Sequence, residues 1–310
     1  MSHPSGFTVP PGYYPPFSIV SDTDHGGWII IATSLGFVLA LISAIIRVYV
    51  KWVSRQSAGA DDLLLALGTI FAFIQESVIL SACAKGLGRK VDLLRPSALR
   101  HVEKSFYSSQ ILTLAALGLC KASCASFIMR LTPKTSVKRT LNVYIACVIA
   151  WMLSGVLAFA LQCNLSSPWG LATSNCTGVY ARIVVIAILD MLLELALFGM
   201  SILLGEAFRV RRAQVKEWIT DLLAFVVSGL KTSAYKRAKV IFAFAMRLPI
   251  VGFIAARLAT GNVSTADFAL SESMYIIWTV TEINYSLIST TLPSKSPNQE
   301  HVVTTKIEVV

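Results

Sequence analysis

Charged side chains are scarce in this chain. They make up 14% of its 310 residues, whereas a typical soluble domain carries about 25%. Hydrophobic residues make up 55% of the chain, and its mean hydropathy is +0.67. This composition excludes an ordinary cytosolic enzyme, a disordered protein and a nucleic-acid-binding domain. We therefore expect a protein embedded in a membrane.

Histidine is also scarce, and its positions exclude two kinds of membrane protein. The four histidines are His3, His25, His101 and His301, and none lies inside a long apolar run. A membrane desaturase needs clustered histidines, and a b-type haem bundle needs paired ones inside the membrane. The chain also lacks a Gly-x-x-x-x-Gly-Lys-Ser/Thr loop, which argues against an ATP-driven pump. We expect no cofactor, no metal site and no catalytic residues.

Seven apolar runs are long enough to cross a bilayer, which takes about 20 helical residues. They cover residues 28–46, 63–84, 105–129, 141–162, 183–204, 240–258 and 268–292. A membrane barrel would show alternating segments of about ten residues, and these runs are continuous. The sequence therefore predicts an all-α polytopic membrane protein, a seven-transmembrane-helix bundle.

Lysine and arginine predict the orientation of this bundle, because cytoplasmic loops carry an excess of both. With the N-terminus outside, the inner segments hold a clear majority of these residues. We expect the proline-rich residues 1–27 to be extracellular or lumenal, residues 28–293 to form the transmembrane domain, and residues 294–310 to be a disordered cytoplasmic tail. The sequence does not distinguish the plasma membrane from an endomembrane.

The loop between the fourth and fifth runs carries two cysteines, Cys163 and Cys176, on the predicted outer side. An oxidising compartment permits a disulfide between them, and two free thiols are the alternative. Asn-x-Ser/Thr sequons begin at Asn164, Asn175 and Asn262, all on that same side. We predict N-glycosylation there.

Charged residues inside the apolar runs are the candidate functional site, because each costs about 2.5–3.5 kcal/mol at the centre of a membrane helix. At a rise of about 1.5 Å per residue, a cation or a carboxylate on each of four runs falls in one layer. A further carboxylate shares a helix face with one of them. The predicted intramembrane polar cluster consists of Lys121, Asp190, Glu194, Arg247 and Glu282.

Two interpretations of this cluster stay open at this stage. It handles a proton or a ligand, or it is a structural ion-pair network that fixes helix packing. Lys121 and Arg247 have a further option, because long cationic side chains can snorkel to the membrane surface. Glu76 falls in the outer half of the membrane, at the same predicted depth as Asp190.

Short motifs follow one another in a characteristic order. They are Gly59-Ala60-Asp61-Asp62, Gly86-Leu87-Gly88, Lys121-Ala122-Ser123, Arg130-Leu131-Thr132-Pro133, Cys163, Pro168-Trp169, Cys176 and Glu282-Ile283-Asn284. From about residue 10 to residue 293, this order resembles the fungal rhodopsin-domain family of seven-helix integral membrane proteins. That family includes the satratoxin-cluster protein 4-like proteins and receptor-like proteins of filamentous fungi. The resemblance marks Gly59, Asp61, Asp62 and Asn284 as family-motif residues.

The resemblance implies a receptor or sensor. The seventh run has no lysine, so the retinal Schiff base of a last-helix lysine is excluded. Implied partners are the lipid bilayer, a small-molecule ligand of unknown identity, and a cytoplasmic signalling partner on the basic inner loops, with no nucleic acid. The alternatives are a small-molecule or proton-coupled transporter and, least favoured, a membrane-embedded enzyme of a secondary-metabolite pathway. We predict that the protein is not an enzyme, because no nucleophile–base pair is recognisable.

The stretch between the fifth and sixth runs departs from the family pattern, in which a short basic loop joins the two. Residues 205–225 are interpreted as an insertion or as a retained intron. Sequencing of cDNA across them distinguishes the two, because a retained intron would be missing from spliced transcripts. If the segment is translated, residues 218–230 are predicted to form an interfacial amphipathic helix.

Overall fold

The computed structural model describes residues 20–21, 23–53, 55, 59–131, 135–161, 179–207, 246–260 and 268–291. These residues form seven α-helices and no β-strand. In chain order, the elements are α1 (Gly26–Val53), α2 (Ala60–Ala84), the 3-10 turn η1 (Val91–Leu93), α3 (Pro96–Leu131), α4 (Thr135–Ala160), α5 (Val179–Ala207), α8 (Leu248–Thr260) and α9 (Phe268–Thr291). The predicted all-α bundle is confirmed.

Five of the seven helices, α1 to α5, are long and apolar enough to cross a membrane, whereas α8 is apolar but has 13 residues. Each predicted run coincides with one helix, with shifted bounds. α3 begins at Pro96, ahead of the predicted residue 105, because proline suits the first position of a helix and the polar residues after it extend the helix past the apolar run. The predicted helix at residues 218–230 lies outside the described residues.

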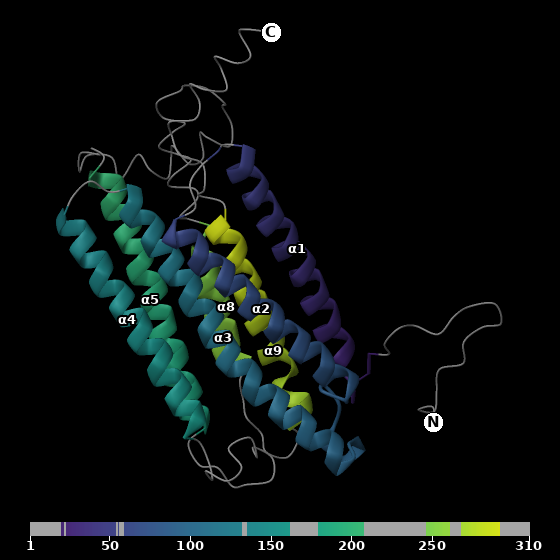
Figure 1. The fold of residues 1–310 in the computed structure, drawn as a ribbon. Helices are drawn as coiled ribbons and strands as arrows, with labels where there is room; N and C mark the ends of the chain where they lie inside the picture. The colour runs from purple at the N-terminus through teal and green to yellow at the C-terminus, as the bar shows by residue number, and fades with distance from the viewer. Residues whose placement is uncertain are drawn as a thin grey trace, which may run out of the picture.

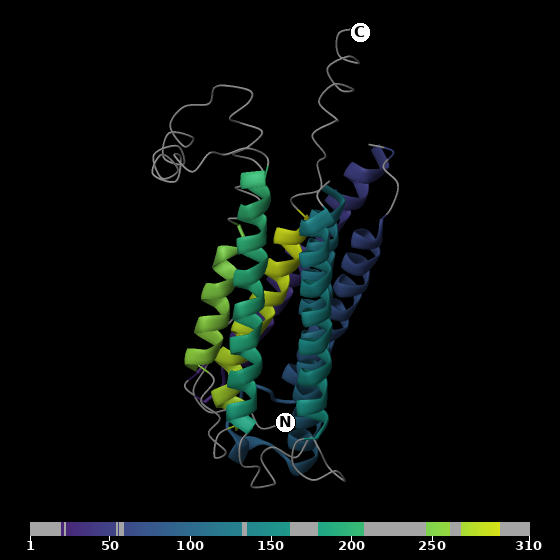
Figure 2. The ribbon, with the colours of Figure 1, turned by 90° about the vertical axis from the view of Figure 1, so that its left-hand side faces the viewer.

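The helices run alongside one another in a single bundle (Figures 1 and 2). α3 packs against α2, α4, α5 and α9, and α1 packs against α2 and α9. We name the two ends of the bundle by residues. The Arg130 end is where α1 and α3 finish and α2 begins, and the Gly88 end is where α2 finishes and α1 and α3 begin.

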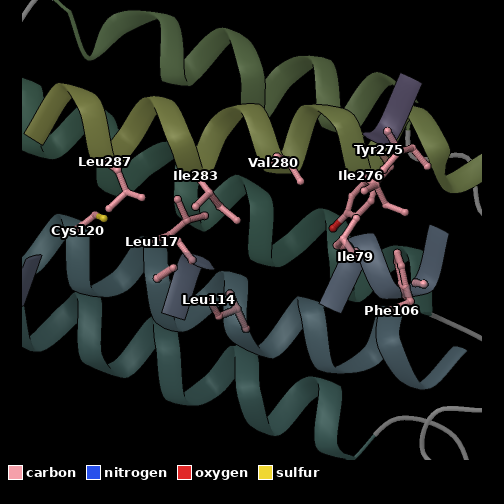
Figure 3. Close-up of a cluster of buried hydrophobic side chains, with 14 of the residues drawn as sticks. Ile79, Phe106, Leu114, Leu117, Cys120, Tyr275, Ile276, Val280, Ile283 and Leu287 are labelled. Atoms are coloured by element: carbon pink, nitrogen blue, oxygen red, sulfur yellow. The ribbon is translucent and has the colours of Figure 1, made fainter. Parts of the chain in front are cut away.

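α3 is the central helix of the bundle. In its most apolar stretch 67% of the residues are buried, against 17% for α1. Small residues bring neighbouring helices close to it: a Cβ atom added to Gly68 of α2 would lie 3.3 Å from the Cβ of Leu119. Apolar side chains of α9, among them Ile283 and Leu287, extend toward Leu117 and Cys120 of α3 (Figure 3). Lipid-facing positions are apolar too, among them Leu35, Ile45, Val48, Leu153, Leu157 and Leu192.

A tight turn after α2 holds the start of α1 at the Gly88 end. Gly86 and Gly88 have φ angles of +109° and +94°, a conformation that only glycine adopts without strain. The carbonyl of Gly88 accepts a hydrogen bond from the backbone N–H of His25 at 2.8 Å. A Cβ atom on Gly88 would lie 2.7 Å from the Cα of Gly26, so the motif glycines serve a close backbone contact.

Candidate functional site

The amino group of Lys121 lies at the centre of a buried charge cluster. Its side chain is 0% exposed, and its Nζ lies 3.0 Å from Oδ1 of Asp190 and 2.9 Å from Oε1 of Glu194. The two carboxylates sit one turn apart on α5 and face α3 together, as the four-residue spacing requires. Snorkelling, the alternative considered for Lys121, is therefore wrong, because two buried carboxylates hold the amino group inside the bundle.

Two arginines extend this pairing in opposite directions. Nη1 of Arg247 donates a hydrogen bond to Oε2 of Glu194 at 3.1 Å. Nη1 of Arg257 lies 3.1 Å from Oε2 of Glu282, and its Nη2 lies 3.9 Å from Oδ2 of Asp190. We call this arrangement the six-charge chain, in the order Arg247, Glu194, Lys121, Asp190, Arg257 and Glu282.

The six-charge chain is electrically balanced and joins four helices. Its three cations and three carboxylates alternate, so every charge has an opposite neighbour. Its members come from α3, α5, α8 and α9, with Arg247 directly before α8. All six are buried. Removing one partner from such a pair leaves an uncompensated buried charge, which typically costs 3–5 kcal/mol.

Aromatic groups surround the middle of the chain. Nζ of Lys121 lies 5.6 Å from the ring centroid of Trp151, within reach of a cation–π interaction. The indole N–H of Trp151 donates a hydrogen bond to the carbonyl of Ile186 at 3.1 Å, and the hydroxyl of Tyr144 donates one to the carbonyl of Leu193 at 3.2 Å. Both bonds tie α4 to α5, the helix that carries the two carboxylates.

A cavity touches the six-charge chain at Arg257. Its volume is about 10 Å³, which is room for about one water. Polar groups reach it from α3, α8 and α9, and the hydroxyl of Tyr275 donates a hydrogen bond to Oε1 of Gln110 at 2.9 Å. The lining includes Gln110, Thr113, Trp151, Phe159, Arg257 and Tyr275.

A wider groove of about 710 Å³ lies between α1, α2 and α3. It is open to the outside of the bundle. Its walls are largely apolar, with Phe37, Phe73 and Ile74 among them, and His101 and Lys104 lie along it. Because the helices that form it are membrane spans, lipid chains are the natural neighbours of this groove.

A second charged cluster lies at the Arg130 end. It consists of Arg47, Lys51, Asp61, Asp62 and Arg130, and we call it the Asp61 cluster. Nη1 of Arg130 lies 2.6 Å from Oδ1 of Asp61, Nη2 of Arg47 lies 2.9 Å from Oδ1 of Asp62, and Lys51 pairs with Asp62. The cluster therefore joins the adjacent ends of α1, α2 and α3.

The family-motif residues at the start of α2 form this cluster. Oδ2 of Asp62 accepts a hydrogen bond from the backbone N–H of Gly59 at 3.1 Å, which caps the helix N-terminus, where a carboxylate is also favoured by the helix dipole. A side chain on Gly59 would meet the guanidinium of Arg130. The carbonyl of Asp61 accepts a hydrogen bond from the hydroxyl of Ser123 at 2.6 Å. Because Gly59 has no side chain, the guanidinium of Arg130 has room to reach Asp61.

Thr290, near the end of α9, connects the two clusters. Its hydroxyl accepts a hydrogen bond from Nη2 of Arg247 at 2.6 Å. Its carbonyl accepts one from Nη1 of Arg47 at 3.0 Å. A continuous series of polar contacts therefore runs from the cavity at Arg257 to the surface at Arg130.

The remaining predicted residues lie elsewhere. The structure places Glu76 on α2 against Asn284 of α9, whose amide donates a hydrogen bond to it. Within the described residues Glu76 forms no ion pair, so the shared depth with Asp190 did not make them neighbours. Cys163 and Cys176, with Asn164, Asn175 and Asn262, lie outside the described residues. So do residues 208–225 of the interpreted insertion, whereas residues 205–207 belong to α5.

Sequence reasoning missed Arg257 and Thr290. Arg257 lies near the end of the sixth predicted run, residues 240–258, and the predicted cluster did not include it. In the structure, Nη1 of Arg257 lies 3.1 Å from Oε2 of Glu282. The same guanidinium also pairs with Asp190. The sequence did contain a signal for Arg257. Arg247 and Arg257 lie on one short apolar run, and two buried cations there require two carboxylate partners on neighbouring helices.

These findings define the class of protein: an all-helical integral membrane protein with a buried chain of balanced charges in its interior. The family model of the fungal rhodopsin domain matches residues 46–216, more than half of the chain, and the chain belongs to that family. The match runs from the last turns of α1 to just past α5, so it includes Lys121, Asp190 and Glu194. No curated protein matches the chain in sequence.

Proposed function

We propose that the protein is a membrane receptor or sensor that uses no retinal and catalyses no reaction. In the proposed orientation its N-terminus is outside and its C-terminus cytoplasmic, so the cavity opens toward the outer side and the Arg130 end faces the cytoplasm. The basic residues at that end would meet a cytoplasmic partner. The cavity holds about one water in this structure, so a small molecule would bind beside Arg257, Gln110 and Tyr275 once the surrounding helices move apart.

One observation carries this proposal: the series of contacts that links the cavity to the Arg130 end. A ligand that draws Arg257 away from Glu282 also changes the ion pair between Arg257 and Asp190. The change then passes through Lys121 and Glu194 to the ion pair of Arg247. Arg247 in turn holds Thr290, which also holds Arg47 of the Asp61 cluster. Packed networks with two discrete arrangements are a physical route for coupling between distant sites.

The same observation disfavours a transporter. The cations and carboxylates between the cavity and Arg247 are all paired, so a charged substrate moving along them would have to separate buried ion pairs. A proton carried along the six-charge chain would require breaking pairs that are each buried. We therefore place transport second, and a membrane-embedded enzyme third.

Hydrogen exchange in lipid nanodiscs tests the coupling. Glu282→Gln removes the negative partner of Arg257, and we expect faster amide exchange both around α8 and at the Arg130 end, near residues 60–66 and 126–131. Glu272→Gln is the matched control, because Glu272 is a buried carboxylate on the same helix without an ion pair among the described residues. A response confined to α8 and α9 would refute the coupling.

Ligand binding and flux then separate the function classes. Purified protein is screened with small organic acids and neutral metabolites by thermal shift, and reconstituted vesicles are assayed for proton and solute flux. A receptor raises its melting temperature with a ligand, loses that response in Arg257→Gln, and shows no flux. Flux that depends on Asp190 or Glu282 would overturn the receptor proposal in favour of transport.

A further inference from the structure

Glu76 differs from the carboxylates of the six-charge chain. Asp190, Glu194 and Glu282 each have a cationic partner, whereas no ion pair among the described residues includes Glu76. Its side chain is 0% exposed in the middle of α2. Its Oε1 accepts a hydrogen bond from Asn284, and its Oε2 has no hydrogen-bond partner among the described residues. A buried carboxyl group in this state either holds a proton or is balanced by a bound cation.

Asn284, which contacts Glu76, carries a second buried oxygen without a partner among the described residues. Its amide nitrogen donates to Glu76 and also to the carbonyl of Val280 at 3.0 Å. Both donations fix the amide orientation, so its Oδ1 is left as an acceptor, and within the described residues it has no partner. Asn284 is 4% exposed, so bulk water does not donate a hydrogen bond to that oxygen.

Gly36 brings α1 up to this pair. A Cβ atom at Gly36 would lie 2.9 Å from Cγ of Asn284, so the asparagine side chain lies directly against the α1 backbone. Thr33 is one helical turn before Gly36 on the same face. It is 0% exposed, and its Oγ1 also has no partner among the described residues. Three helices, α1, α2 and α9, thus each contribute a buried oxygen that has no partner in the part of the chain that the structure describes.

Carboxylate, amide and hydroxyl oxygens are the ligands that hard cations prefer. A single carboxylate without a cationic neighbour balances one positive charge, which selects a monovalent ion over a divalent one. We propose that Glu76, Asn284 and Thr33 bind one sodium ion between α1, α2 and α9. The ion holds α9 against α1 and α2. This inference does not rest on the proposed receptor role.

Thermal unfolding of the purified full chain tests the proposal. Sodium chloride replaces choline chloride at constant ionic strength, at one pH below neutrality and one above it, with potassium and lithium chloride in parallel series. We expect the melting temperature to rise with sodium and to level off, by roughly 5 °C at saturation. Potassium should give a smaller rise at the same concentration, because it is the larger ion.

Three variants locate the ion. Glu76→Gln removes the charge but keeps the shape, and it should abolish the sodium response without lowering the melting temperature measured in choline. Thr33→Val should shift the response to higher sodium concentrations, and it serves as the second probe if the glutamine variant fails to fold. Glu272→Gln, at another buried carboxylate without a partner among the described residues, should keep the full response.

Two results would overturn the proposal. One is a melting temperature that is the same in sodium and choline at both pH values. The other is stability that depends on pH but not on the cation, with that dependence lost in Glu76→Gln, because Glu76 would then be balanced by a proton. A sodium response that survives Glu76→Gln and Thr33→Val alike also counts against this site.

Discussion

Arg47 and Arg247, exactly two hundred positions apart, bind the same residue. Arg47 donates to the carbonyl oxygen of Thr290 and Arg247 donates to its hydroxyl. Through these bonds the end of α9 is held by the Asp61 cluster on one side and by the six-charge chain on the other. Neither arginine contacts the other's carboxylate partner in the described residues, so Thr290 is their link.

Replacement of the Thr290 hydroxyl should therefore destabilise the protein. Thr290→Val keeps the shape and the carbonyl but removes the acceptor of Arg247, and we expect a loss of about 1.5–3 kcal/mol, the usual range for a hydrogen bond to a charged group. Thr281→Val is the control, since that hydroxyl bonds only its own helix at Ile277. Equal melting temperatures for the two variants would contradict the role of Thr290.

Lys121 should be strongly coupled to Asp190 and weakly coupled to Glu282. Lys121→Met leaves two carboxylates on α5 without their shared cation, and we expect a loss of about 3–5 kcal/mol. A double-mutant cycle with Asp190→Asn should give a coupling energy of about 0.5–3 kcal/mol, as for residues in direct contact. The parallel cycle with Glu282→Gln should give less, and a larger value there would mean that the charges pair differently.

Trp151 should contribute more to stability than a lipid-facing tryptophan. Trp151→Phe removes the N–H that bonds the carbonyl of Ile186 and weakens the contact with Lys121, so we expect a loss of about 1–2 kcal/mol. Trp28→Phe is the matched control, because Trp28 is 52% exposed. Chemical denaturation in mild detergent measures both, and similar losses would show that Trp151 acts by bulk alone.

Gly88 should not tolerate a side chain. Gly88→Ala would place a Cβ atom against the backbone of Gly26 at a φ of +94°, so we expect a loss of more than 1 kcal/mol. Gly252→Ala is the control, since a Cβ atom there meets nothing within 4 Å and alanine favours a helix. Its melting temperature should stay equal or rise, and a fall in both variants would refute the backbone argument.

The helices followed from the sequence because lipid dictates their length and composition. Residues 28–46 carry no charged residue and residues 63–84 carry one, Glu76, and α1 and α2 contain these runs whole. A depth count placed Lys121, Glu194 and Arg247 in one layer, and these three do pair. The count could not find Arg257 as the partner of Glu282, because helix tilt and the choice of neighbouring helix come from packing of the whole bundle. For the same reason the sequence did not predict the contact between Glu76 and Asn284.

The balance of the six-charge chain bears on how the protein is made. The family segment, residues 46–216, supplies one of its cations and two of its carboxylates, and the rest of the chain supplies two cations and one carboxylate. The early helices therefore carry a surplus negative charge between α3 and α5 until Arg247 and Arg257 follow, and we expect their packing to be less stable before then. Insertion of the last two helices is thus the step that completes the fold, and a chain ended at residue 216 should be held by the quality-control machinery rather than mature.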